Sequence, residues 1–67
     1  MDIRITVNKK EMIVTADITI NKLLELLQYN SRVSVWVNQK QLLFGDYSGC
    51  RIKEGDKVMI YRLVAGG

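Results

Sequence analysis

Apolar and polar residues alternate over 3–7, where isoleucine or valine occupies every second position. This period of two is typical of a strand with one buried face. A polar break at 8–11 separates this segment from a second apolar stretch, 12–16, and Asn8 at the head of the break tolerates a left-handed backbone. We therefore expect 3–7 and 12–16 to form an antiparallel hairpin with a short loop.

A helix is expected next, because the apolar spacing changes from two to three and four residues. Thr19 precedes this pattern and can cap the first free amides with its hydroxyl. The apolar stripe consists of Ile20, Leu23, Leu24 and Leu27. Asn30 follows the stripe and is a candidate for a left-handed C-cap, so the helix is expected to end there.

The rest of the chain predicts three more strands. These strands are 33–37, 41–44 and 58–63. Between the last two lie an irregular, turn-rich segment at 45–49 and a tight turn in which Gly55 can adopt a positive φ. The resulting β-β-α-β-β-β order predicts an α+β fold, in which a mixed sheet of four to five strands packs on one helix.

The length and composition limit what the chain can do. Its 67 residues allow a single domain, 1–67, and the net charge of +3 comes from scattered residues without the basic stripe of a nucleic-acid binder. The sequence has no histidine, which excludes imidazole zinc sites and nucleophiles activated by histidine. We therefore expect a protein that is not an enzyme and that binds neither a metal nor nucleic acid.

The cysteine count and the lengths of the apolar segments predict where the protein is located. A single cysteine cannot form an internal disulfide, and no apolar segment is long enough for a signal peptide or a membrane span. We expect a cytoplasmic protein that does not associate with membranes. Cys50 has no evident base beside it, although Arg51 could lower its pKa, and we interpret it as an incidental small residue.

Two glycines, Gly66 and Gly67, end the sequence directly after the last predicted strand. A frayed end is the ordinary explanation for such a pair. A functional explanation also exists, because glycine has no Cβ and lets the backbone pass through a narrow channel to approach a nucleotide. The reactive group would then be the C-terminal carboxylate, which becomes a good acyl donor only once its oxygen is a leaving group, for example after adenylation.

The chain resembles the ubiquitin-like β-grasp family and, within it, the prokaryotic sulfur carriers of the ThiS and MoaD type. The matching pieces are Thr19 with Leu23 and Leu24 on the helix, Val37–Asn38, Glu54–Val58 and Val64–Gly67. In this order and spacing they span nearly the whole chain. The thiamine-biosynthesis branch is the closer match, because the chain is short and lacks the proline that often precedes the tail in molybdopterin carriers.

The resemblance implies a function for the tail, 64–67, which we expect to be flexible. In this family an E1-like, ThiF-type enzyme uses ATP to adenylate the terminal glycine, and the acyl-adenylate becomes a thiocarboxylate that donates sulfur. Gly67 would carry the thiocarboxylate, and Ala65 and Gly66 would be threaded into the partner. Further implied partners are a sulfur donor such as a cysteine desulfurase and a ThiG-type thiazole synthase as acceptor. The carrier itself would bind no cofactor.

A partner-docking surface is expected on the sheet face that points away from the helix. If Val58 and Ile60 face the helix, alternation sends their neighbours to the opposite side. The residues expected there are Trp36, Met59, Tyr61 and Leu63. Aromatic and methionine side chains are enriched in interface cores, and the resemblance implies a partner-binding patch at this place. We expect Arg62 to steer the tail toward an acidic groove of the partner.

Alternative functions share the same fold. One is a sulfur carrier for molybdopterin synthesis, and another is a ubiquitin-like protein modifier or interaction module. A third is an RNA-binding β-grasp domain, which would have no use for a free Gly-Gly end and would show a salt-sensitive affinity for RNA.

Overall fold

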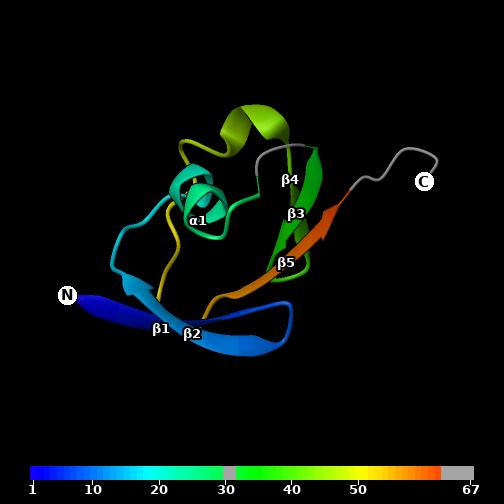
Figure 1. The fold of residues 1–67 in the computed structure, drawn as a ribbon. Coiled ribbons are helices and arrows are strands. Elements are labelled where there is room, and N and C mark those ends of the chain that lie inside the picture. The colour runs from blue at the N-terminus through cyan, green and yellow to red at the C-terminus, as the bar shows by residue number, and fades with distance from the viewer. Residues whose placement is uncertain (30–31, 63–67) are drawn as a thin grey trace.

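A five-stranded mixed sheet and one α-helix make up the part of the chain that the computed structural model describes, residues 1–29 and 32–62 (Figure 1). The elements are β1 (Asp2–Val7), β2 (Lys10–Thr15), α1 (Ile20–Leu26), β3 (Val33–Val37), β4 (Lys40–Leu42), the 3-10 helix η1 (Phe44–Asp46) and β5 (Lys57–Arg62). The strand order is β2-β1-β5-β3-β4, with β1 and β5 parallel and the other pairs antiparallel. The expected α+β, ubiquitin-like β-grasp fold is confirmed.

Both hairpins turn through two residues with positive φ. Asn8 and Lys9 have φ of 51° and 71°, and Asn38 and Gln39 have φ of 51° and 70°. Positive φ at both central residues is what a type I′ turn requires, and asparagine adopts this conformation at low cost. The two turns are thus equivalent, one between β1 and β2 and the other between β3 and β4.

The asparagine of each turn also binds the central strand, β5. The Oδ1 atom of Asn8 accepts a hydrogen bond from the backbone N–H of Ile60 at 2.7 Å, and its Nδ2 donates to the carbonyl of Ile60 at 3.1 Å. On the other side, Asn38 Oδ1 accepts from the N–H of Lys57 at 2.9 Å, and its Nδ2 donates to Asp56 Oδ1 at 2.9 Å. Each hairpin is therefore attached to β5 by a side chain as well as by its strand.

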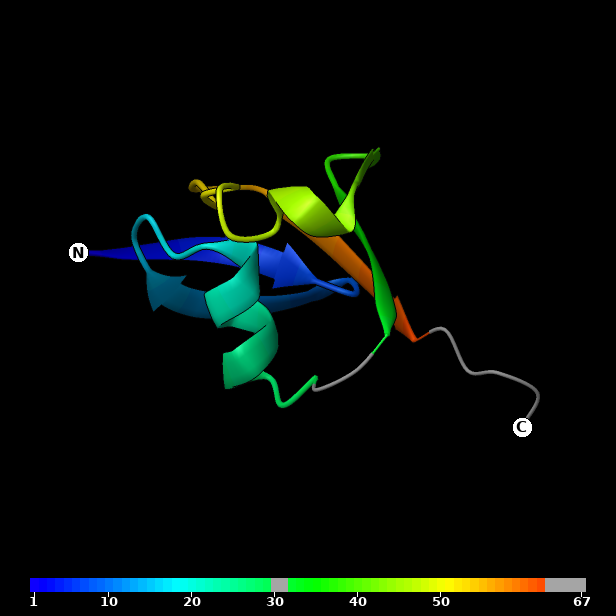
Figure 2. The same ribbon diagram turned by 90° about the horizontal axis from the view of Figure 1, so that it is seen from above.

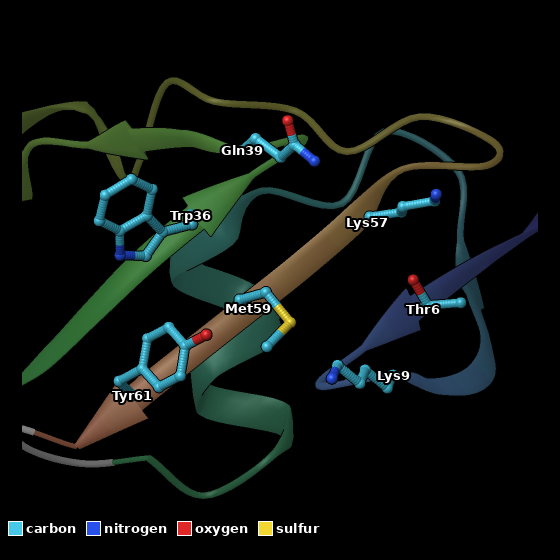
Figure 3. A pocket seen from close by; sticks show the side chains of 7 residues that line it. All are labelled: Thr6, Lys9, Trp36, Gln39, Lys57, Met59 and Tyr61. Atoms are coloured by element: carbon cyan, nitrogen blue, oxygen red, sulfur yellow. The ribbon is translucent and has the colours of Figure 1, made fainter.

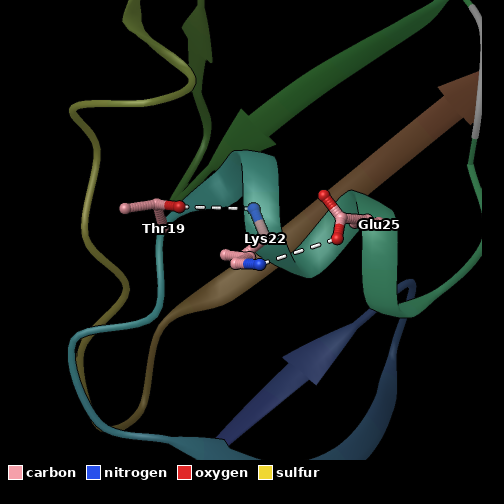
Figure 4. A network of polar contacts seen from close by, with 3 residues as sticks. All are labelled: Thr19, Lys22 and Glu25. Carbon is pink, nitrogen blue, oxygen red and sulfur yellow. Dashed lines mark hydrogen bonds and ion pairs between the residues drawn. The ribbon is translucent and has the colours of Figure 1, made fainter.

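The helix begins where its sequence predicts and ends earlier. The Thr19 hydroxyl accepts a hydrogen bond from the N–H of Lys22 at 3.2 Å, as expected of an N-cap, and Lys22 forms an exposed ion pair with Glu25 at 3.6 Å (Figure 4). The helix ends at Leu26, and Gln28 adopts the left-handed conformation with φ of 65°. The prediction of Asn30 as C-cap is wrong, and Asn30 itself lies outside the described residues.

Hydrogen bonds explain the early end of the helix. The N–H of Gln28 donates to the carbonyl of Glu25 at 3.1 Å, and the N–H of Tyr29 donates to the carbonyl of Leu24 at 2.8 Å. This pair of bonds is that of a Schellman motif, which satisfies carbonyls that the helix leaves free. Gln28 thus occupies a position that glycine or asparagine usually fills, and Tyr29 is held at the end of the helix.

The core lies between the helix and one face of the sheet (Figure 2). Its buried residues are Ile3, Ile5, Val7, Val14, Ile20, Leu23, Leu24, Val35, Tyr47, Ile52, Val58 and Ile60. Tyr47 comes from the segment predicted to be irregular, 45–49, and Ile52 lies between that segment and the turn at Gly55. The N–H of Asn21 donates to the carbonyl of Tyr47 at 3.2 Å, and the N–H of Ile52 donates to that of Ile18 at 2.8 Å, so this segment packs along the start of α1.

The predicted fourth strand, 41–44, is displaced. Strand β4 covers Lys40–Leu42, and Phe44 begins the 3-10 helix instead of ending the strand. The turn before β5 is as predicted, because Gly55 has φ of 84° and its N–H donates to the carbonyl of Arg4 at 2.8 Å.

The asparagine attachment of β5 predicts a measurable loss of stability. Replacing Asn8 by Ala removes two hydrogen bonds to Ile60, which are worth about 1 kcal/mol each. Lys9→Ala is the matched control, because Lys9 has a similar φ but makes no such bond to β5. We expect the free energy of unfolding in urea to fall by about 2 kcal/mol more for Asn8→Ala than for Lys9→Ala. Equal losses in the two variants would contradict this account.

Candidate functional site

Some predicted site residues fall outside the part of the chain that the structure describes. These residues are Leu63, which was predicted for the docking surface, and Ala65, Gly66 and Gly67 of the tail. The segment 64–67 and its expected flexibility therefore stay predictions. The other predicted site residues are described, and all of them lie on β3 or β5.

Trp36, Met59 and Tyr61 lie together on the sheet face that points away from α1 (Figure 3). Strand register explains this arrangement, because Trp36 on β3 is paired with Met59 on β5, and Tyr61 follows two residues later on the same face. Tyr61 is 50% exposed, whereas Trp36 and Met59 are half-buried. The expectation that these three side chains are neighbours is confirmed.

These three side chains line one end of a hollow of about 800 Å³, which we call the open-face hollow. Its complete lining is Thr6, Lys9, Trp36, Gln39, Lys57, Met59 and Tyr61. The lining is mainly apolar where β3 and β5 lie side by side, and it carries two lysines where β5 begins beside β1 (Figure 3). A hollow of this kind on a sheet suits a side chain of a partner protein better than a substrate that must be enclosed.

The polar atom of Trp36 is already satisfied inside the sheet. Its Nε1–H donates to the hydroxyl of Ser34 at 3.1 Å, and the same hydroxyl accepts from Gln41 Nε2 at 3.3 Å. These bonds use side chains on the same face of neighbouring strands. The indole therefore presents apolar surface to the hollow without an unpaired donor, as the core of an interface requires.

Arg62 is not part of this cluster. It follows Ile60 by two residues, so it belongs to the face of β5 that α1 covers, opposite Tyr61. Its guanidinium carbon lies 5.1 Å from the centre of the Tyr29 ring, within the range of a cation–π contact. Arg62, which was predicted to steer the tail, thus lies on the other face of the sheet from Met59 and Tyr61, as the alternation of the strand requires.

Cys50 does not have the environment of a reactive thiol. Burial raises the pKa of the Cys50 thiol, and the carboxylates of Asp56 and Asp46 raise this pKa further. The expectation that Arg51 could lower the pKa is therefore wrong. A raised pKa leaves little thiolate at neutral pH, and the thiolate is the nucleophilic form.

Residues 1–29 and 32–62 contain neither a candidate metal site nor a helix that could span a membrane. There, no group of three or more cysteine, aspartate or glutamate side chains could hold a metal ion. The helix of this described part is also too short and too polar to cross a membrane.

Comparisons with known proteins agree with the fold. The model of the ThiS family matches residues 2–67. The crystal structure of the thiamine biosynthesis protein ThiS from Geobacter metallireducens superposes with a TM-score of 0.84 and 26% sequence identity, covering 97% of this chain and 100% of that one. No curated protein sequence matches the chain. The chain therefore belongs to the ThiS family of small sulfur carrier proteins.

Proposed function

We propose that this carrier is loaded with sulfur at the carboxylate of Gly67 and delivers it to the thiazole of thiamine. In the first step a carboxylate oxygen attacks the α-phosphorus of ATP, pyrophosphate leaves and an acyl-adenylate forms. In the second step the terminal sulfur of a donor persulfide attacks the acyl carbon, and AMP leaves with the oxygen. A second thiol of the partner then cleaves the S–S bond of the acyl disulfide, which leaves a disulfide on the partner and the reduced sulfur on the carrier. The product is a thiocarboxylate on Gly67, and these steps take place in a partner's active site.

The observation that carries this proposal is the extent of the family match. It runs to residue 67 and so includes Gly66 and Gly67 together with the folded part of the chain. A pair of glycines suits a tail that must enter a narrow active site, because no Cβ limits the approach of the backbone. The open-face hollow supports the proposal from the folded side, since it offers a place for the partner to dock.

The partners follow from this chemistry. We propose an E1-like, ThiF-type enzyme for the adenylation, a sulfur donor such as a cysteine desulfurase, and a ThiG-type thiazole synthase as the acceptor. The similar structure from Geobacter metallireducens is described as a thiamine biosynthesis protein, which favours thiamine over molybdopterin as the product. The adenylating partner would use ATP as its cosubstrate. We therefore propose that the reaction takes place in the cytoplasm.

Lengthening the tail should prevent activation. With one alanine added after Gly67, the carboxylate would lie one residue farther along and would miss the α-phosphate, and we expect ATP–pyrophosphate exchange by the ThiF-type enzyme to fall to background. The control carries one extra residue at the amino terminus and should be activated normally. Exchange at the normal rate in the lengthened variant would refute activation at Gly67.

Docking at the open-face hollow should depend on its aromatic residues. Trp36→Ala and Tyr61→Ala should each weaken binding to the ThiF-type enzyme by about 2 kcal/mol, since exposed aromatic side chains are frequent hot spots. Ile13→Ala is the matched control, because Ile13 is 54% exposed and lies outside the lining of the hollow. Titration calorimetry would measure all three affinities. Unchanged affinity in both aromatic variants would show that the hollow is not part of the docking surface.

Cys50 should not take part in sulfur transfer. Since its pKa is raised, little thiolate is present at neutral pH, and we expect Cys50→Ser to form the thiocarboxylate at the wild-type rate. Intact-mass spectrometry over time measures this rate, and a variant without Gly67 is the negative control that cannot form the thiocarboxylate at that residue. A large drop in rate for Cys50→Ser, with an unchanged unfolding curve, would show that a relay passes through this thiol.

A further inference from the structure

The open-face hollow has two chemically different ends. Trp36, Met59 and Tyr61 form an apolar end, whereas Lys9 and Lys57 lie beside Thr6 at the other end (Figure 3). Lys57 is paired with Thr6 on β1, and the turn that contains Lys9 follows the end of β1 and is bonded to Ile60 through Asn8. The hollow is therefore basic on the side toward β1 and apolar on the side toward β3.

The fold holds both cationic residues in place at the backbone. Lys9 is the second residue of a two-residue turn, and Asn8 attaches that turn to β5. Lys57 is the first residue of β5, and its N–H donates to Asn38 Oδ1 at 2.9 Å. Gln39 occupies in the second turn the position that Lys9 occupies in the first, and it lines the hollow from the opposite side.

Within the described part of the chain neither Lys9 nor Lys57 forms an ion pair, and the nearest carboxylate by strand register is that of Glu11, which is paired with Thr6 across β1 and β2. The lining of the hollow includes no aspartate or glutamate. The one ion pair among the described residues joins Lys22 and Glu25 on α1, away from the hollow (Figure 4). Because the lining contains two lysines and no carboxylate, it is electrostatically complementary to carboxylates of a partner.

We infer that the occupant of the hollow is a segment of the adenylating enzyme that combines an apolar side chain with carboxylates. This inference rests on the proposed function. The apolar side chain would lie on Trp36, Met59 and Tyr61, and the carboxylates would face Lys9 and Lys57. Because Lys9 and Lys57 lie toward β1 and Trp36 lies on β3, the acidic part of the segment contacts the side of the hollow next to β1. Two cations beside an apolar surface suit an acidic peptide better than a phosphate backbone.

The test measures binding of the ThiF-type enzyme to charge variants at several salt concentrations. The double variant Lys9→Gln/Lys57→Gln should bind about tenfold more weakly at low ionic strength, mainly through slower association. Glutamine is suitable at residue 9, since Gln39 has almost the same φ. Gln39→Lys adds a cation at the equivalent position and should bind more tightly than wild type. Lys22→Gln is the control for net charge and should bind as wild type.

The salt dependence of the affinity distinguishes an electrostatic effect from other causes of weaker binding. At roughly 1 M salt the Debye length is about 3 Å, so the affinities of these variants should converge. Wild-type affinity for the double variant at low salt, together with weakened binding of Trp36→Ala, would overturn the acidic partner and leave the proposed function intact. Absence of any activation of the wild type would overturn both the acidic partner segment and the proposed function. Displacement of the enzyme by a uridine RNA homopolymer would assign the lysines to nucleic acid and overturn the inference.

Discussion

The position of β5 depends on hydrogen bonds from both hairpin turns. Strand β1 is paired with β5 at only two positions, Thr6 with Lys57 and Val7 with Val58. Asn8 continues this contact beyond the end of β1 by bonding both backbone groups of Ile60, and Asn38 binds the start of β5 from the other side. Central strands normally receive such bonds from neighbouring backbones, so here two side chains complete the pairing of the middle strand.

This attachment also determines what the sheet presents to a partner. Because β5 lies between β1 and β3, its outward residues meet Trp36 on one side and the Lys9 turn on the other. Apolar surface and positive charge thus occur in one hollow, although their residues are distant in the sequence. In the sequence the same strand precedes the segment that ends in Gly67, so the proposed docking surface and the proposed sulfur-carrying tail belong to consecutive segments.

Local patterns predicted the fold, and contacts between distant segments account for what they missed. Alternation predicted the strands and the common face of Trp36 and Met59, which follow from the period of two. That these two residues are neighbours followed from the resemblance to the β-grasp family, in which the last strand lies beside the third. The end of the helix was missed because hydrogen bonds of a Schellman motif place Gln28, a residue without a marked left-handed preference, in the left-handed conformation. Ile52 in the core was missed because a single apolar residue in a loop has no periodicity. The presence of Lys9 and Lys57 in one hollow depends on the parallel contact of β1 with β5, which no local pattern encodes.

The central claim is that Gly67 carries sulfur. The most direct measurement is intact-mass spectrometry of the protein purified from its own cells, without reductive or alkaline treatment. The account predicts a species heavier by the replacement of one oxygen with sulfur, and fragmentation should locate the change at Gly67. A population with only the unmodified mass, from cells shown to be making thiamine, would contradict the account. A branched adduct between Gly67 and a lysine of another protein would instead indicate a modifier.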